Sequence, residues 1–303
     1  MIGIDCSSGS LADVRPAVIG YNETADGIEY MVASESVAVE ALGFRVLRDI
    51  VPGEAVFIDE DGNFHSQQCV ESWSLNPCIF EYVYLARPDS LIDGASVYEA
   101  RLHMGEKLVE KIRRQYQHLA IDVVIPIPDS SRPSALQLAL GLGVPYREGF
   151  VKNRYIGRTF IMPGQEVRKR SVRQKLNVIG MEFKGKNVLL VDDSIVRGTT
   201  SRKIVRIMRS AGAREVHVRI SCPPTVAPCF YGIDTPTQKE LIASSHSIDD
   251  IRNYIGADSL AYLSLDGLRG AVGDAQGEFC TACYTGHYPT KLVTLQMEAA
   301  SRR

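Results

Sequence analysis

Residues 188–200 read VLLVDDSIVRGTT, and this stretch decides the predicted fold. A run of apolar residues forms a strand that ends on two adjacent carboxylates, Asp192 and Asp193. A turn of small residues at 198–200 then leads into a predicted helix. A continuous apolar strand followed by a helix is typical of a parallel sheet that is covered on both faces.

The neighbouring segments repeat this alternation. We predict strands at 121–128, 186–191 and 215–220, and helices at 133–142 and 199–211. A longer helix is expected from about residue 96 to 118, with Ser96 as its cap and Glu99 three residues further on. The fold class of this region is therefore α/β.

Residues 15–70 follow a different pattern. Short apolar runs at 17–21, 30–34 and 55–58 are bounded by turn signals such as the DEDG at 59–62. This spacing predicts an antiparallel sheet. The chain thus begins with a β-rich region and continues as an α/β domain.

Length and composition narrow the class of protein. The 303 residues suffice for one large or two modest domains, with 45% hydrophobic and 23% charged residues. The net charge of −2 argues against an extended nucleic-acid-binding surface. No apolar run approaches the roughly 18 residues that span a bilayer, and the start shows no secretory signal. We expect a cytoplasmic protein that binds neither nucleic acid nor a membrane.

The acidic pair and the turn after it predict a ligand site. In open parallel sheets, ligands bind at the carboxyl ends of the strands. The start of the helix offers backbone N–H groups and hydroxyls to a phosphate monoester. Neighbouring strand residues point to opposite faces, so Asp192 and Asp193 do not easily share one metal ion. They can instead reach the hydroxyls of a sugar, or a hydrated Mg²⁺. The alternative is a buried strand followed by an acidic turn and a helix cap.

These features, together with several other segments, resemble the amidophosphoribosyltransferase family. VLLVDDSIVRGTTS is similar to the phosphoribosyl pyrophosphate (PRPP) motif of type I phosphoribosyltransferases. The other matching segments are YMVASESVA (30–38), RDIVPGEAV (48–56), FEYVYLARPDS (80–90), IPIPDSS (125–131) and KNRYIGRTFIMPGQ (152–165). The resemblance covers roughly residues 15–290. It implies a type I phosphoribosyltransferase sheet with flanking helices.

The resemblance implies roles for individual residues. Asp192 and Asp193 would hold the ribose hydroxyls and Mg²⁺, and Ser130 would complete the metal and pyrophosphate end. The 5-phosphate cradle would run from Ser194 to Thr200 and include Arg197, Gly198 and Thr199. Lys152, Arg154 and Arg158 would lie on a basic loop that closes over PRPP; the alternative is a solvated basic surface.

The cysteines carry a second implication. The chain has seven, an odd number, and residues 280–283 form a C-x-x-C. One branch of the family holds a [4Fe–4S] cluster, and the matching positions here are Cys78, Cys229, Cys280 and Cys283. The alternatives are buried inert cysteines or a Zn²⁺ ion in a Cys₄ site. We interpret Cys69 and Cys222 as core residues, and Cys6 as an incidental exposed thiol.

Most of the family's N-terminal glutaminase domain has no counterpart in this sequence. We expect residues 1–75 to be a remnant of that Ntn-type sandwich with apolar surface left uncovered, residues 1–14 matching nothing. The phosphoribosyltransferase domain would span 76–250, and a helical, cysteine-bearing segment at 251–303 would pack on it. Either the chain is truncated or misread, or it works with ammonia or with a separate glutaminase chain.

The predicted function is transfer of the phosphoribosyl group from PRPP to ammonia in purine synthesis, without glutamine hydrolysis by this chain. A closing loop would exclude water from the reacting carbon. Purine nucleotides would act as inhibitors, and we expect a homo-oligomer. The alternatives are a regulatory protein that binds PRPP or a purine nucleotide without catalysis, and an inactive fragment.

Overall fold

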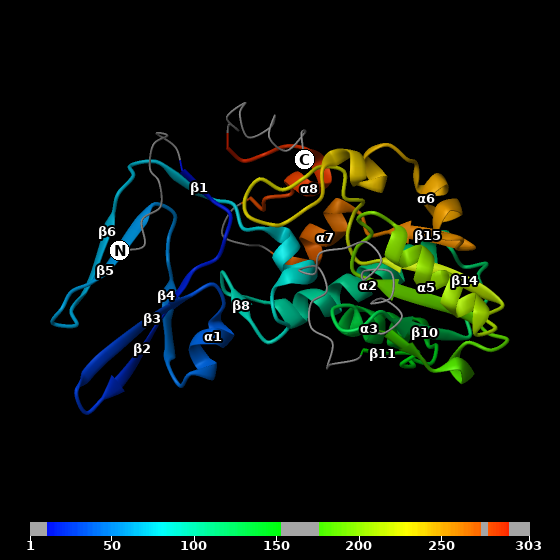
Figure 1. Cartoon of the computed structure of the whole chain (residues 1–303), viewed down its shortest axis with the longest axis horizontal. Coiled ribbons are helices and arrows are strands. Elements are labelled where there is room, and N and C mark those ends of the chain that lie inside the picture. The colour runs from blue at the N-terminus through cyan, green and yellow to red at the C-terminus, as the bar shows by residue number, and fades with distance from the viewer. Residues whose placement is uncertain (1–10, 153–175, 274–277, 291–303) are drawn as a thin grey trace, which may run out of the picture. The chain divides into compact units, whose positions relative to one another are not determined.

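The computed structural model describes residues 11–152, 176–273 and 278–290. These residues form two compact units. One comprises residues 1–100, 228–235 and 272–303, and the other comprises 101–227 and 236–271. Each unit is described separately below, and Figure 1 gives the order of their elements along the chain.

The second unit is built on a four-stranded parallel sheet of order β10-β13-β14-β15. The strands are β10 (Val123–Pro126), β13 (Asn187–Asp192), β14 (Glu215–Ile220) and β15 (Ser259–Tyr262). Every residue of β10 and β13 is buried, as the continuous apolar runs in the sequence predict. The first three strands lie within two residues of their predicted bounds, whereas β15 was not predicted.

Helices cover both faces of this sheet. They are α2 (Val97–Gln115), α3 (Arg132–Leu142), α5 (Thr199–Ser210), α6 (Ile248–Ile255) and α7 (Leu265–Val272). After α3 the chain returns along the outer side of β10, where Tyr146 pairs with Val124. The helices α5 and α6 lead to β14 and β15, which lie on the other side of β10. Because such crossovers are right-handed, α3 lies on one face of the sheet and the α5–α6 pair lies on the opposite face. The α/β prediction is confirmed.

The helix termini follow the signals in the sequence. The backbone N–H of Glu99 donates to Ser96 Oγ at 3.3 Å, which confirms Ser96 as the cap of α2. This helix ends at Gln115, three residues before the predicted end. Gly143 ends α3 in the left-handed conformation, with φ of 69°. Within the described part of the chain, no helix is long and apolar enough to cross a membrane.

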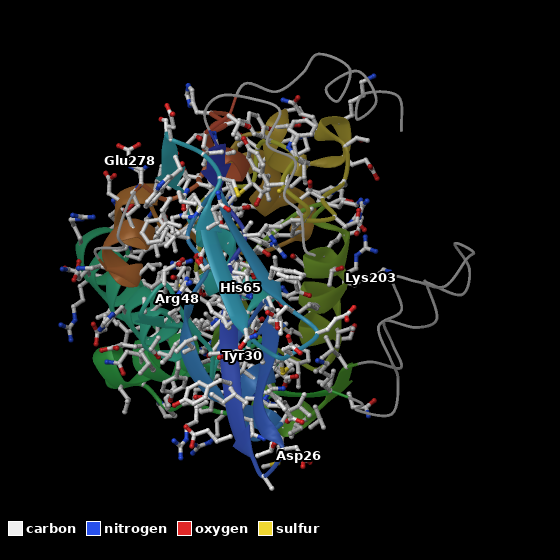
Figure 2. All side chains as sticks on the ribbon, turned by 90° about the vertical axis from the view of Figure 1, so that its left-hand side faces the viewer. Asp26, Tyr30, Arg48, His65, Lys203 and Glu278 are labelled. Atoms are coloured by element: carbon white, nitrogen blue, oxygen red, sulfur yellow. The ribbon has the colours of Figure 1, made fainter. Side chains whose placement is uncertain are left out.

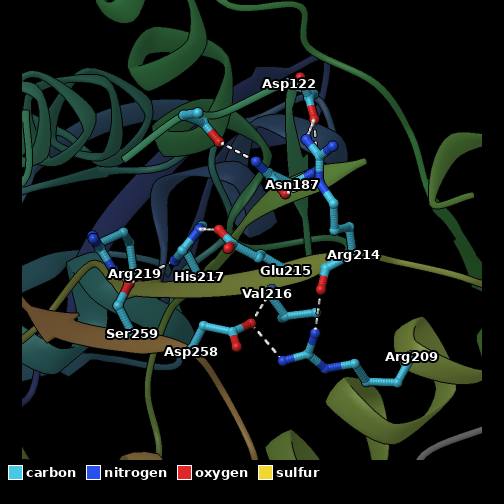
Figure 3. Close-up of polar contacts among 11 residues, drawn as sticks. Asp122, Asn187, Arg209, Arg214, Glu215, Val216, His217, Arg219, Asp258 and Ser259 are labelled. Atoms are coloured by element: carbon cyan, nitrogen blue, oxygen red, sulfur yellow. Dashed lines mark hydrogen bonds and ion pairs between the residues drawn. The ribbon is translucent and has the colours of Figure 1, made fainter. Parts of the chain in front are cut away.

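Smaller elements complete this unit. The strands β11 (Phe150–Lys152) and β12 (Leu176–Val178) pair antiparallel. Three short 3-10 helices follow, η3 (Gly180–Glu182), η4 (Gln238–Glu240) and η5 (Ile242–Ser244). A polar network lies where β13, β14 and β15 begin (Figure 3). In it the Asp258 carboxylate accepts the Val216 N–H at 2.6 Å and also contacts Arg209.

The first unit is mostly antiparallel, as predicted for residues 15–70. Its strands are β1 (Leu11–Asp13), β2 (Val18–Thr24), β3 (Gly27–Ala33), β4 (Arg45–Asp49), β5 (Glu54–Ile58), β6 (Phe64–Gln68), β7 (Trp73–Leu75), β8 (Leu91–Ile92) and β9 (Ala95–Ser96). They form a three-stranded sheet β3-β2-β4 and three separate strand pairs. The helical elements are α1 (Ser36–Ala41), the π-helical turn η1 (Glu81–Leu85) and α8 (Ala282–Thr285).

Side-chain contacts link the sheet β3-β2-β4 to the strand pair β5-β6; Tyr30 and Arg48 of the sheet are labelled in Figure 2. The Tyr30 ring on β3 lies 5.1 Å from the Phe64 ring on β6. Arg48 on β4 donates to Glu54 Oε2 on β5 at 2.8 Å, and this contact lowers the pKa of Glu54 to about 2. Several large apolar side chains are nevertheless well exposed, among them Ile28, Leu42, Leu47, Phe57 and Trp73. That this unit is the remnant of a larger sandwich stays a prediction.

Candidate functional site

The candidate site lies in the second unit, at the carboxyl ends of β10 and β13. These strands are neighbours in parallel register, with Pro126 opposite Val191. The Ile127 N–H donates to the Val191 carbonyl at 2.8 Å, so the two strands remain paired up to the loops that follow them. The order of strands reverses at this point, because the chain leaves β10 on one side and returns to β13 on the other. In open α/β sheets such a switch point is where ligands bind.

Asp192 is the last residue of β13, and it is buried. Its Oδ1 accepts the backbone N–H of Asp193 at 3.0 Å. Burial, and then the neighbouring charge of Asp193, raise the pKa of Asp192 well above its usual value. The carboxyl group therefore sits where a positive ligand would strongly favour its ionised form.

Asp193 is also buried, and two hydroxyls hold its carboxylate. Ser130 Oγ, from the loop after β10, donates to one oxygen at 2.5 Å, and Ser194 Oγ donates to the other at 2.5 Å. Burial raises the pKa of Asp193, while Ser130, Ser194 and the Arg101 guanidinium lower it. The predicted association of Ser130 with the acid pair is thus seen as a direct hydrogen bond.

Arg101 belongs to this cluster and was not predicted. It lies on α2 with 3% of its surface exposed. Its backbone carbonyl accepts Ser134 Oγ of α3 at 2.7 Å. A single arginine on an amphipathic helix gives no sequence signal, because the same residue type is common on solvated helix faces.

The start of α5 lies just beyond the acid pair. Gly198 precedes the helix with φ of +71°, and a Cβ there would lie 3.1 Å from Ile242 Cδ1. The position thus requires glycine for both conformation and space. No side chain caps this helix, and Thr199 and Thr200 are exposed. Its first N–H groups therefore face a region where a phosphate could bind.

Two predicted cations contact carboxylates. Arg197 is exposed, and its Nε donates to Glu240 Oε1 of η4 at 3.0 Å. Lys152, at the end of β11, donates from Nζ to Asp129 Oδ2 at 2.9 Å. Asp129 follows β10 and also pairs with Arg132, so it brings Lys152 to the loop that carries Ser130. The other predicted loop cations, Arg154 and Arg158, lie outside the described residues.

The four predicted cluster cysteines all belong to the first unit. Cys78 and Cys280 form a backbone bridge, with the Cys280 N–H donating to the Pro77 carbonyl at 2.9 Å. Burial, then Glu81, then Cys280 raise the pKa of Cys78 to about 12. Burial raises the pKa of Cys280, and Cys229 adds a smaller contribution in the same direction.

Cys283 completes this set. It lies in α8, partly exposed. Burial raises the pKa of Tyr288 to about 12, with smaller contributions from Cys229, Cys283, Tyr231 and Cys280. Cys229, Cys280 and Cys283 therefore lie within electrostatic reach of Tyr288, and Cys78 lies within reach of Cys280. In the described ranges, however, no three Cys, His, Asp or Glu side chains converge closely enough to hold a single metal ion.

The remaining cysteines give a mixed outcome. Cys222 is fully buried, as predicted. The prediction that Cys69 is a core residue is wrong, because it is exposed just after the β5–β6 strand pair. Cys6 lies outside the described residues.

Comparisons with known proteins agree with this geometry. Residues 96–228 match the family model described as a phosphoribosyl transferase domain. The chain is 56% identical over 280 residues to the amidophosphoribosyltransferase of Pseudomonas aeruginosa, covering 91% of this chain and 56% of that protein. For the Escherichia coli enzyme of that name the identity is 54%, over 92% of this chain and 56% of the relative.

Solved structures give the same result. The glutamine PRPP amidotransferase of B. subtilis, complexed with ADP and GMP, superposes with a TM-score of 0.79 at 47% identity. The match covers 92% of this chain and 60% of that one. The chain thus spans just over half the length of the curated relatives named above. It belongs to the amidophosphoribosyltransferase family.

Proposed function

We propose that this chain transfers the phosphoribosyl group of PRPP to ammonia, giving 5-phosphoribosylamine and pyrophosphate. The observation that carries the proposal is the pair Asp192–Asp193 beside the uncapped start of α5, at the switch point of the sheet. Carboxylates suit the hydroxyls of a sugar, and a helix start suits a phosphate. One ligand that carries both groups in this order is a ribose 5-phosphate.

In this reaction the ammonia lone pair forms a bond to C1 of the ribose. The bond from C1 to the pyrophosphate oxygen breaks, and its electron pair leaves with pyrophosphate. We propose that Asp192 and Asp193 hold the ribose hydroxyls, while residues 194–200 hold the 5-phosphate. Lys152 would leave its contact with Asp129 and bind the leaving group, where negative charge gathers during the reaction. Arg154 and Arg158 are proposed to act with it.

The acid pair also fits Mg²⁺. Both carboxyl pKa values are raised, chiefly by burial, so the pair lacks sufficient positive charge around it. Carboxylate and hydroxyl oxygens are hard donors that suit this ion. Asp192, Asp193 and Ser130 would hold it. Its chemistry there would be to neutralise charge on the pyrophosphate.

A [4Fe–4S] cluster is our proposal for Cys78, Cys229, Cys280 and Cys283. Thiols from three separate parts of the chain come together in one unit, two of them across a backbone bridge. Around an iron–sulfur cube the thiolates stand further apart than around one ion. In the described ranges, no group of side chains is close enough to hold a single ion such as Zn²⁺. The wider spacing of thiolates around a cluster is compatible with this finding. The thiol pKa values are raised in the chain without the cluster, and binding of the cluster would remove the thiol protons.

We further propose that this chain alone does not hydrolyse glutamine, and that ammonia or a separate glutaminase chain supplies the nitrogen. The exposed apolar side chains of the first unit support the proposal that residues 1–75 are part of a larger sandwich. We propose 76–250 as the transferase domain, with 251–303 packing on it. We also propose a homo-oligomer inhibited by purine nucleotides. The complex of the B. subtilis relative with ADP and GMP supports such nucleotide binding.

The same structural relative supports a second candidate function, a regulatory protein that binds PRPP or a purine nucleotide without turnover. The test is to supply anaerobically purified protein with PRPP, Mg²⁺ and either ammonium or glutamine, and to measure pyrophosphate and PRPP binding in parallel. Our proposal predicts pyrophosphate release with ammonium and none with glutamine. Tight PRPP binding without release would favour the regulatory protein, and glutamine-dependent release would contradict the missing-glutaminase proposal.

A further inference from the structure

Arg219 is the largest side chain in the described structure that is fully buried. It lies on β14 in the second unit, with 0% of its surface exposed. Its side chain lies on the same face of the strand as that of His217, two residues earlier. Ser259 on β15 contacts both side chains (Figure 3). Arg219 pairs in register with Val191, and neighbouring strand residues point to opposite faces, so the Arg219 and Asp192 side chains lie on opposite faces of the sheet.

The guanidinium group is only half satisfied. Nη1 donates to the Val218 carbonyl at 2.8 Å and to Ser259 Oγ at 3.0 Å. The ring of Tyr116 covers the planar face, with the guanidinium carbon 4.2 Å from the ring centroid. Nε and Nη2 are buried and have no hydrogen-bond partner. These two nitrogens form the side-on edge of arginine, whose parallel N–H groups fit two oxygens of one anion.

The surroundings add positive charge to this edge. Lys111 on α2 donates from Nζ to the Tyr262 carbonyl at 2.5 Å. Burial lowers the pKa of Lys111, and the charges of Arg219 and Arg114 lower it further. His217 donates from Nε2 to Glu215 Oε2 at 3.1 Å, and its Nδ1 contacts Ser259 Oγ at 3.0 Å. Burial, and then Arg219, lower the pKa of His217. In the described part of the chain, no salt bridge joins Arg219, Lys111 or Arg114 to a carboxylate.

An unpaired buried charge is costly, and a buried donor pair without acceptors adds to that cost. We propose that the Nε–Nη2 edge of Arg219, with Lys111 nearby, forms a second anion site that takes a small oxyanion of the phosphate class. Lys111 and Tyr116, the neighbours of the guanidinium group, are each only partly buried. The site is independent of the PRPP site and of its proposed reaction.

Inorganic phosphate is a suitable probe, provided that binding at the start of α5 is removed. In the full chain carrying Thr199→Asp, a carboxylate at that helix start would repel phosphate. Phosphate is then titrated at constant ionic strength against chloride, while equilibrium dialysis counts bound phosphate and thermal unfolding follows stability. We expect saturable binding of one phosphate per chain and a matching rise in the unfolding midpoint.

Three further variants decide the assignment. Arg219→Lys keeps the charge but loses the side-on edge, so its phosphate affinity should fall at least about tenfold. Lys111→Met should weaken binding as well. Arg214→Met is the matched control, because Arg214 already donates to Asn187 and contacts Asp122, and it should bind phosphate as the background chain does.

The outcomes that overturn the proposal are equally definite. A flat phosphate titration would show that water alone satisfies Arg219. An equal effect of chloride and phosphate would show general screening, and unchanged affinity in Arg219→Lys would place the phosphate elsewhere. Arg219→Lys retains the charge and a long side chain, and its thermal unfolding without phosphate shows whether the variant is folded.

Discussion

Gly198→Ala tests whether the start of α5 holds the 5-phosphate. Gly198 has φ of +71°, and the new Cβ would lie 3.1 Å from Ile242 Cδ1 and 3.2 Å from Tyr254 Cε1. The left-handed backbone costs an L residue about 1–2 kcal/mol, and crowding typically costs about 1–3 kcal/mol. Because both neighbours are ends of side chains that can shift, the crowding cost should be at the low end. We expect the free energy of unfolding to fall by about 2–3 kcal/mol.

Gly256→Ala is the matched control for this strain. Gly256 has φ of +79° at the end of α6, and its nearest neighbour would be Val205 Cγ1 at 3.9 Å. Urea unfolding should therefore show a loss of about 1–2 kcal/mol, from the backbone alone. The difference between the two variants measures the crowding at Gly198.

The kinetic result separates a structural role from a substrate role. If the N–H groups at the start of α5 bind the 5-phosphate, Gly198→Ala should raise the KM for PRPP by about tenfold, which corresponds to about 1.4 kcal/mol. Gly256→Ala should leave the KM near that of the unmodified chain. Equal stability losses together with an unchanged KM in Gly198→Ala would refute the reasoning.

Three other changes test separate parts of the account. Asp192→Asn should abolish transfer but raise the free energy of unfolding of the metal-free chain at pH 7, because folding raises the pKa of Asp192 and so favours its protonated form. The gain should shrink as the pH falls and Asp192 takes up its proton. Urea unfolding with a chelator present measures it. Gly105→Ala should destabilise the α2–α3 contact by about 1–3 kcal/mol, since its Cβ would lie 2.4 Å from the backbone oxygen of Ser134. The control is Gly270→Ala, whose Cβ meets nothing within 4 Å and which should be tolerated. Thermal melts of both variants measure the difference. Cys283→Ser should lower the iron content and visible absorption of anaerobically purified protein, whereas Cys69→Ser should not; equal iron in both would argue against the cluster.

The sequence predicted the parts of the fold in which local signals agree. Residues 188–191 are continuously apolar before Asp192, and the small-residue turn at 198–200 begins a helix, so β13 and α5 lie within one residue of their predicted bounds. Ser96 was found for a similar reason, since a hydroxyl before an amphipathic segment is a strong cap signal. The strand β15 was missed because four residues, SLAY, are too short to show a period.

The candidate site was predicted only where a motif carried it. The motif residues Asp193 and Ser194 are joined by a hydrogen bond, and Ser130 comes to them from 63 residues away. Arg101 was missed because its approach to Asp193 depends on how α2 packs, which no local pattern encodes. Cys69 was placed in the core because cysteine is usually buried, but it follows the last residue of β6 and is exposed there.

The central claim is most directly tested by counting products from PRPP, Mg²⁺ and ammonium. The account predicts equal amounts of pyrophosphate and 5-phosphoribosylamine from the anaerobically purified chain, and neither from Asp193→Asn. Folded protein that binds PRPP yet releases no pyrophosphate, or that releases it equally well without Asp193, would contradict the account.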